Sequence, residues 1–244
     1  MIVTNDDGFD APGIQALAEA AGGLGDLVVV APQDVQSGVG HQVTAYDAFP
    51  VVREGEVGYR IGGTPADCVR VALAALEPEA GWVLSGINDG ANLGVDVFTS
   101  GTVAAAREAA FHGRRALAIS QYFAQDRTLD WSLVAARARA VLDVLVEIPI
   151  EPGQFWNVNL PHVEDASAAL DLVFCRVDPS PHGLGYEVRG EVARYTSNYH
   201  DRPRRSGFDT TVCFEGAIAV TLLQADGQSI NPEPDGRVLR RIGG

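Results

Sequence analysis

Residues 26–32 read DLVVVAP, an uninterrupted apolar run that ends at a proline. Such a run is typical of a strand in a parallel sheet whose two faces are both covered by helices. Residues 116–120, ALAIS, show the same pattern, and shorter apolar runs occupy residues 1–4 and 81–87. These segments predict the strands of a mostly parallel sheet.

Helical patterns separate the predicted strands. Apolar residues recur at three- and four-residue intervals in residues 14–24, 65–76, 102–113 and 130–148. Strands that alternate with helices form βαβ units, so we predict an α/β fold with a three-layer core.

The character of the chain changes towards its C-terminus. Four strand-like segments follow, at residues 155–161, 171–177, 185–190 and 216–224, with no strong helix between them. We therefore predict a core domain over residues 1–160. Residues 161–244 form a β-rich extension that we do not expect to fold independently.

The composition limits the class of partner and the compartment. The formal net charge is −14, from 18 basic and 32 acidic residues, which argues against a nucleic-acid duplex as partner. No apolar run approaches the ~20 residues that a membrane span needs, and the N-terminus lacks a signal-peptide pattern. Three widely spaced cysteines fit buried, reduced thiols. We therefore expect a cytoplasmic protein with no membrane partner.

Polar stretches follow the predicted strands at residues 4–8, 32–41 and 85–94, and another opens a helix at residues 99–102. In an open α/β sheet, ligands bind beyond the carboxyl ends of the strands. All four stretches are therefore expected on one rim. The adjacent carboxylates Asp6 and Asp7 favour a metal site there over a capping turn, since a turn needs only one such residue. Magnesium and manganese prefer oxygen ligands of this kind.

The remaining stretches add amide and hydroxyl groups to this rim. Asn88 and Asn92, set between glycines, are able to ligate a hard cation or bind an oxyanion. Residues 100–102 read SGT, which is compatible with both a helix cap and phosphate binding. His41 is the histidine nearest the rim, and a structural role is favoured over general-acid catalysis. The arginines of residues 200–209 are interpreted as a solvated loop, with an anion-facing or subunit-contacting arm as the alternative.

Four blocks of the sequence, at residues 3–14, 28–41, 63–73 and 85–110, occur in an order that resembles the SurE family of survival-protein nucleotidases. The resemblance implies a Rossmann-like core and a metal-dependent phosphatase that hydrolyses nucleoside monophosphates. It implies 5′-nucleotidase activity and leaves 3′-nucleotidase and exopolyphosphatase activity open. It also implies homodimers or homotetramers that exchange C-terminal elements.

The resemblance also implies roles for individual residues. One Mg²⁺ or Mn²⁺ per subunit would be held by Asp6, Asp7, Ser37 and Asn88, and phosphate by Asn92, Ser100, Gly101 and Thr102. Asp6 and Asp7 are the expected catalytic residues, with Asp6 preferred as the group that orients or deprotonates the attacking water. Two other classes remain open: a non-catalytic nucleotide-binding module and a metal-dependent nucleotide-sugar transferase.

Overall fold

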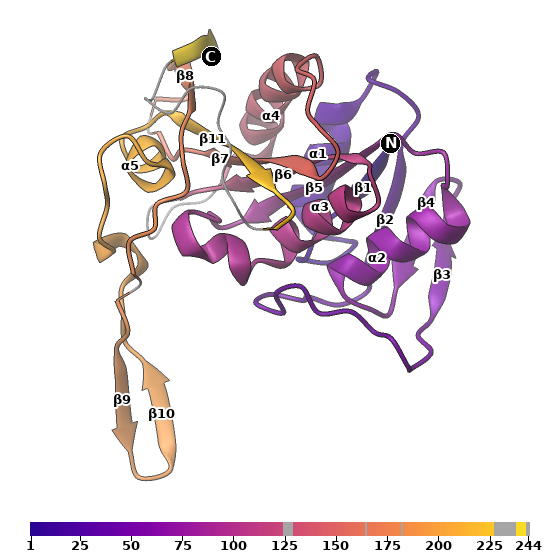
Figure 1. Cartoon of the computed structure of the whole chain (residues 1–244), viewed down its shortest axis with the longest axis horizontal. Helices are drawn as coiled ribbons and strands as arrows, with labels where there is room; N and C mark the ends of the chain where they lie inside the picture. Colours follow the sequence, from indigo (N-terminus) through magenta and orange to yellow (C-terminus); the bar gives the residue numbers. More distant parts are fainter. Residues whose placement is uncertain (124–128, 164, 182, 227–237, 243–244) are drawn as a thin grey trace.

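A ten-stranded sheet runs through the computed structural model, which describes residues 1–123, 129–163, 165–181, 183–226 and 238–242 (Figure 1). The strand order is β12-β8-β11-β7-β6-β5-β1-β2-β4-β3. The block from β7 through β6, β5, β1 and β2 to β4 pairs in parallel throughout. The predicted mostly parallel α/β fold is therefore confirmed.

The predicted elements of the first half are all present. The strands are β1 (Ile2–Thr4), β2 (Val28–Pro32), β5 (Trp82–Asp89) and β6 (Arg115–Gln121). The helices are α1 (Pro12–Ala21), α2 (Pro65–Val71), α3 (Gly101–Phe111) and α4 (Trp131–Leu145), and a π-helical turn (Ala72–Leu76) extends α2. Thr64 caps α2 and closes a capping box with Asp67, as the TPxD pattern indicates.

In the first half of the chain, two strands were missing from the prediction. β3 (Val51–Glu54) and β4 (Gly58–Ile61) form an antiparallel hairpin at one edge of the sheet, and β4 pairs in parallel with β2. The pattern is weak because every residue of β3 except Glu54 is exposed. An edge hairpin of this kind buries too little apolar surface to produce a periodic signal.

Two apolar layers cover the sheet. Leu17 of α1 and Leu142 of α4 belong to the core of one face, whereas Val69 of α2 and Val103 of α3 belong to that of the other. Gly13 of α1 lies against β5 so closely that a Cβ there would meet the carbonyl oxygen of Ile87 at 1.9 Å. This glycine sets the distance between helix and strand.

Most strands of the C-terminal part join the same sheet. They are β7 (Gln154–Leu160), β8 (Leu170–Phe174), β11 (Ile218–Gln224) and β12 (Val238–Ile242). The predicted domain boundary thus falls at the end of β7, inside a continuous sheet. The sequence predicts no strong helix after residue 160, and the α-helix found among the described residues there, α5 (Asp209–Phe214), is short and precedes β11.

One hairpin stands apart from the body of the molecule. β9 (Tyr186–Arg189) and β10 (Val192–Tyr195) pair only with each other and project from the body (Figure 1). Every residue of the two strands is exposed.

The three cysteines are buried and free, as the sequence predicts. Within the described residues, no helix combines the length and the apolar character that crossing a membrane requires.

Candidate active site

A cavity of about 280 Å³ opens at the carboxyl ends of β1 and β5. Six of the eight predicted site residues line it: Asp6, Asp7, Ser37, Asn88, Asn92 and Ser100. The other lining residues are Gly38, Asp89, Ala91, Asp96, Thr99 and Tyr199. The parallel sheet thus brings four sequence-distant loops to one rim, as a fold of this class does.

Asp6 lies at the buried end of the cavity, with 4% of its surface exposed. Loss of water raises the pKa of its carboxyl group to about 6, although a hydrogen bond of 2.5 Å from the Thr102 hydroxyl to Oδ1 partly opposes this shift. The adjacent charge of Asp7 raises the pKa further. A carboxyl group in this position becomes ionised more readily when a cation is bound near it.

Asp7 and Asp89 add two more carboxyl groups. Burial raises the pKa of Asp7, whose Oδ2 accepts a hydrogen bond of 3.2 Å from the backbone N–H of Asp89. The more exposed Asp89 also has a raised pKa, because part of its hydration is lost. The cavity therefore gathers three acids whose pKa values are all raised by loss of hydration.

Ser37 and Asn88 contribute neutral oxygens. The backbone N–H of Gln36 donates to the carbonyl oxygen of Asp6 at 2.7 Å, which holds the Ser37 loop beside the acid pair. Asn88 donates from Nδ2 to the carbonyl of Gly90 at 2.6 Å, so its amide oxygen is the atom offered to a cation. Carboxylate, hydroxyl and amide oxygens together form a donor set suited to Mg²⁺ or Mn²⁺.

The four residues predicted to hold a metal ion include only two carboxylates. In the described part of the chain, no group of three or more His, Cys, Asp or Glu residues is arranged to hold a metal ion. A zinc-type site is thus not found there, whereas the oxygen-rich set around Asp6 and Asp7 is compatible with a hard cation.

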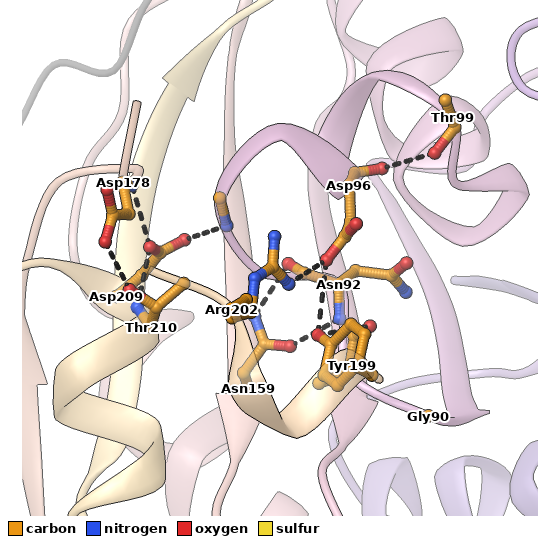
Figure 2. A network of polar contacts seen from close by, with 12 residues as sticks. Gly90, Asn92, Asp96, Thr99, Asn159, Asp178, Tyr199, Arg202, Asp209 and Thr210 are labelled. Atoms are coloured by element: carbon orange, nitrogen blue, oxygen red, sulfur yellow. Dashed lines mark hydrogen bonds and ion pairs between the residues drawn. The ribbon is translucent and has the colours of Figure 1, made fainter. Parts of the chain in front are cut away.

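Asn92 is fixed by side chains from two strands, and Figure 2 shows its contact with Asn159 of β7. Its backbone N–H donates to Asn159 Oδ1 at 2.8 Å, and its carbonyl oxygen accepts hydrogen bonds of 3.1 Å from Asn157 and Asn159. Its side-chain amide donates to Ser120 Oγ at 2.8 Å. Asn92 is therefore held rigidly at backbone and side chain alike.

The three residues of the SGT segment, 100–102, have different contacts. Ser100 lines the cavity and caps α3, accepting a hydrogen bond of 3.1 Å from the N–H of Val103. Gly101 and Thr102 are not among the lining side chains, and the Thr102 hydroxyl is engaged with Asp6. A Cβ at Gly101 would lie 2.8 Å from Asp6 Cβ and Oδ2, so this glycine allows α3 to approach Asp6.

The C-terminal arm, defined as residues 175–209, supplies a wall that the sequence did not indicate. Tyr199 lines the cavity and donates a hydrogen bond of 3.2 Å to Asp96 Oδ2 (Figure 2). Arg202 forms an ion pair of 2.5 Å with the same oxygen. The interpretation of residues 200–209 as a solvated loop is wrong for Arg202, which is 7% exposed. Asp89 and Tyr199 are among the residues of the cavity that the sequence prediction missed. The position of Asp89 directly after Asn88 was a signal that could have identified it, whereas no local motif marks Tyr199.

His41 does not line the cavity. Its Nε2 lies 2.7 Å from Glu108 Oε2 of α3, and its ring stacks on Phe111 with centroids 5.3 Å apart. These contacts fasten the residue 33–50 loop to α3, which agrees with the favoured structural role.

Fold and cavity together define an α/β protein with an acidic, oxygen-rich site at the carboxyl rim of its sheet. The family model "Survival protein SurE" matches residues 1–179, and the chain belongs to the SurE family.

Relatives match over nearly the whole chain. A protein of Nostoc sp. is 48% identical over 224 residues, which cover 92% of this chain and 99% of the relative. The "5'-nucleotidase SurE" of Halobacterium salinarum is 42% identical, and the match covers 92% of this chain and 91% of the relative. The crystal structure of the SurE protein from Aquifex aeolicus superposes with a TM-score of 0.81 at 29% identity, covering 92% and 93% of the two chains.

Proposed function

We propose that this chain is a divalent-metal-dependent 5′-nucleotidase that hydrolyses nucleoside monophosphates to nucleoside and phosphate. The observation that carries the proposal is the gathering of Asp6, Asp7, Ser37 and Asn88 around one cavity. The names of relatives such as the "5'-nucleotidase SurE" of Halobacterium salinarum support it.

The metal ion, either Mg²⁺ or Mn²⁺, would be held by Asp6, Asp7, Ser37 and Asn88. When bound, such an ion supplies Lewis-acid polarisation of a phosphoryl oxygen and lowers the pKa of nearby water. The raised pKa values of Asp6 and Asp7 support this assignment, because neither acid has a positive partner among the residues that the structure describes.

The side chains of the cavity have distinct tasks in the hydrolysis. Thr102 holds Oδ1 of Asp6, and the other carboxylate oxygen of Asp6 orients the attacking water and takes its proton. Asn92, Ser100 and the N-terminal N–H groups of α3 bind the phosphoryl oxygens. The water oxygen forms a bond to phosphorus while the bond from phosphorus to the ester oxygen breaks, and the ester oxygen takes a proton from solvent and leaves as the nucleoside hydroxyl.

A phosphate-release assay tests this function. Nucleoside 5′- and 3′-monophosphates are incubated with Mg²⁺, Mn²⁺ or EDTA, with wild type, Asp7→Asn and the exposed-site control Asp47→Asn. We expect metal-dependent release from 5′-monophosphates that Asp7→Asn lowers by at least about a hundredfold and Asp47→Asn leaves unchanged. Nucleotide binding without phosphate release would instead favour a non-catalytic nucleotide-binding module. Consumption of nucleotide sugars would favour a transferase.

We also propose that the β9–β10 hairpin contacts another copy of the chain. Its apolar side chains Tyr186, Val188, Val192 and Tyr195 are each more than half exposed. An isolated two-stranded hairpin is at best marginally stable in water, and packing against a second subunit would stabilise it. Light scattering should find a dimer or tetramer that Val188→Asp dissociates and the control Val57→Asp, also at an exposed valine, does not.

A further inference from the structure

We propose that a second pocket, directly beside the acidic cavity, binds the heteroaromatic base of the nucleotide. The inference rests on the proposed function. The pocket has a volume of about 290 Å³. It is lined by Gly90, Ala91, Tyr122, Phe123, Tyr199 and His200.

The two hollows share a wall. Ala91 and Tyr199 line both the aromatic pocket and the acidic cavity. A ligand whose phosphate lies among the acidic and amide side chains therefore has its adjoining part beside the aromatic pocket. In a nucleoside monophosphate, the ribose would span this wall and the base would lie beyond it.

The walls are supplied by segments far apart in the sequence. Tyr122 and Phe123 follow the carboxyl end of β6, whereas Tyr199 and His200 belong to the C-terminal arm. The Tyr122 hydroxyl and His200 Nδ1 are 2.9 Å apart, and the Tyr122 ring stacks on Phe214 with centroids 4.4 Å apart. These contacts fix the rings before a ligand arrives, which lowers the entropic cost of binding.

Tyr199 is fixed in the same way. Its hydroxyl donates to Asp96 at 3.2 Å, and the Arg202 guanidinium lies 4.8 Å from the centroid of its ring (Figure 2). The hydroxyl is thus directed to the polar side of the wall. The ring remains as the surface between the two hollows.

The chemistry of this pocket favours a planar aromatic group. Four of its six lining residues carry aromatic rings, and the Tyr122 hydroxyl is already engaged with His200. Recognition by stacking tolerates different bases, because every base has a π-face. The pocket therefore selects nucleotides over base-free phosphomonoesters, and purines over the smaller pyrimidines, without reading the base edge.

A selectivity measurement tests the proposal. The kcat/KM values for AMP, CMP and ribose 5-phosphate are compared in Mn²⁺ for wild type, Phe123→Ala and Tyr46→Ala, the last a fully exposed aromatic outside the pocket. We expect wild type to favour AMP over ribose 5-phosphate by about tenfold or more, with CMP between them. Phe123→Ala should reduce this preference by about tenfold, mainly through KM for AMP, and Tyr46→Ala should preserve it. Equal kcat/KM for AMP and ribose 5-phosphate, or an equal loss on both in Phe123→Ala, would overturn the proposal.

Adenosine binding separates this inference from the proposed function. Calorimetry should detect adenosine binding to wild type that Phe123→Ala weakens by about tenfold. If no phosphomonoester is hydrolysed but this binding is found, the subsite stands and the nucleotidase function fails. If adenosine does not bind and Phe123→Ala changes the oligomeric state, the pocket is a subunit contact and the proposal is overturned.

Discussion

Arg202 Nη1 lies 2.5 Å from Asp96 Oδ2, and this ion pair joins the C-terminal arm to the 3-10 helix Gly94–Phe98 that follows β5 (Figure 2). Burial lowers the pKa of the Arg202 guanidinium, but the hydrogen bond and charge of Asp96 outweigh it, so that the pKa is raised overall. The same guanidinium covers the Tyr199 ring. The pair thus holds the aromatic wall of the cavity in place.

Replacing Arg202 should detach this wall. In Arg202→Ala, Asp96 loses a buried cationic partner, which we expect to destabilise docking of the arm by about 2–4 kcal/mol. Limited proteolysis should then cleave the arm faster than in wild type, and KM for AMP should rise. The matched control is Arg205→Ala, since Arg205 is exposed. Equal proteolysis of both variants and wild type would contradict a structural role for the ion pair.

Gly101 should be intolerant of even one methyl group. In Gly101→Ala, the new Cβ would lie 2.8 Å from Asp6 Cβ, so the carboxyl group must move. Because alanine is a good helix former, we expect little change in melting temperature but a fall in kcat of about ten- to a hundredfold. Gly81→Ala is the control, because a Cβ there meets no atom within 4 Å. Wild-type kcat in Gly101→Ala would show that Asp6 is not sensitive to this contact.

Asp209 should make stability depend on pH. Burial raises the pKa of the Asp209 carboxyl group to about 6. Hydrogen bonds from the backbone N–H groups of Gly94, Asp178 and Thr210 favour the ionised form and oppose part of this shift. A carboxyl group with a raised folded-state pKa stabilises the fold when protonated, and this contribution is lost as the pH rises through about 6. Its share of the free energy of unfolding should therefore fall by about 2–3 kcal/mol between pH 4 and pH 7, as the pH passes from the unfolded-state pKa to the folded-state pKa.

Denaturant titrations of wild type and Asp209→Asn check this dependence. The variant cannot ionise, so the difference in stability between wild type and variant should change with pH across this window. Asp209→Asn should also be less stable than wild type at pH 5, because its amide presents N–H groups to backbone donors. The exposed-site control Asp47→Asn should follow the wild-type curve. Parallel curves for wild type and Asp209→Asn would refute the assignment.

The sequence predicted the features that arise from local patterns. Strands such as β2 and helices such as α4 are long and periodic, and Asp6 and Asp7 lie directly after a strand whose carboxyl end must reach the rim. The edge hairpin β3–β4 and the buried state of Arg202 were not predicted. β3 is mostly exposed and therefore shows no apolar period, whereas the burial of Arg202 depends on Asp96, 106 residues away in the chain. No local periodicity records such a contact.

Asn159 provides a final test of how the site is held. It makes two hydrogen bonds to the backbone of Asn92, at N–H and at C=O, whereas Asn157 makes one, at C=O. Both side chains are buried on β7, so Asn157→Ala is a matched control for Asn159→Ala.

Asn159→Ala leaves the buried N–H of Asn92 without its acceptor, which costs about 1–3 kcal/mol in addition to the lost bond to the carbonyl oxygen. We expect competitive inhibition by inorganic phosphate to weaken more in Asn159→Ala than in Asn157→Ala, because Asn92 loses its fixed position. The Ki for phosphate and the free energy of unfolding are measured for both variants. If the two variants weaken phosphate binding equally, the bond to the N–H of Asn92 does not position this residue for phosphate.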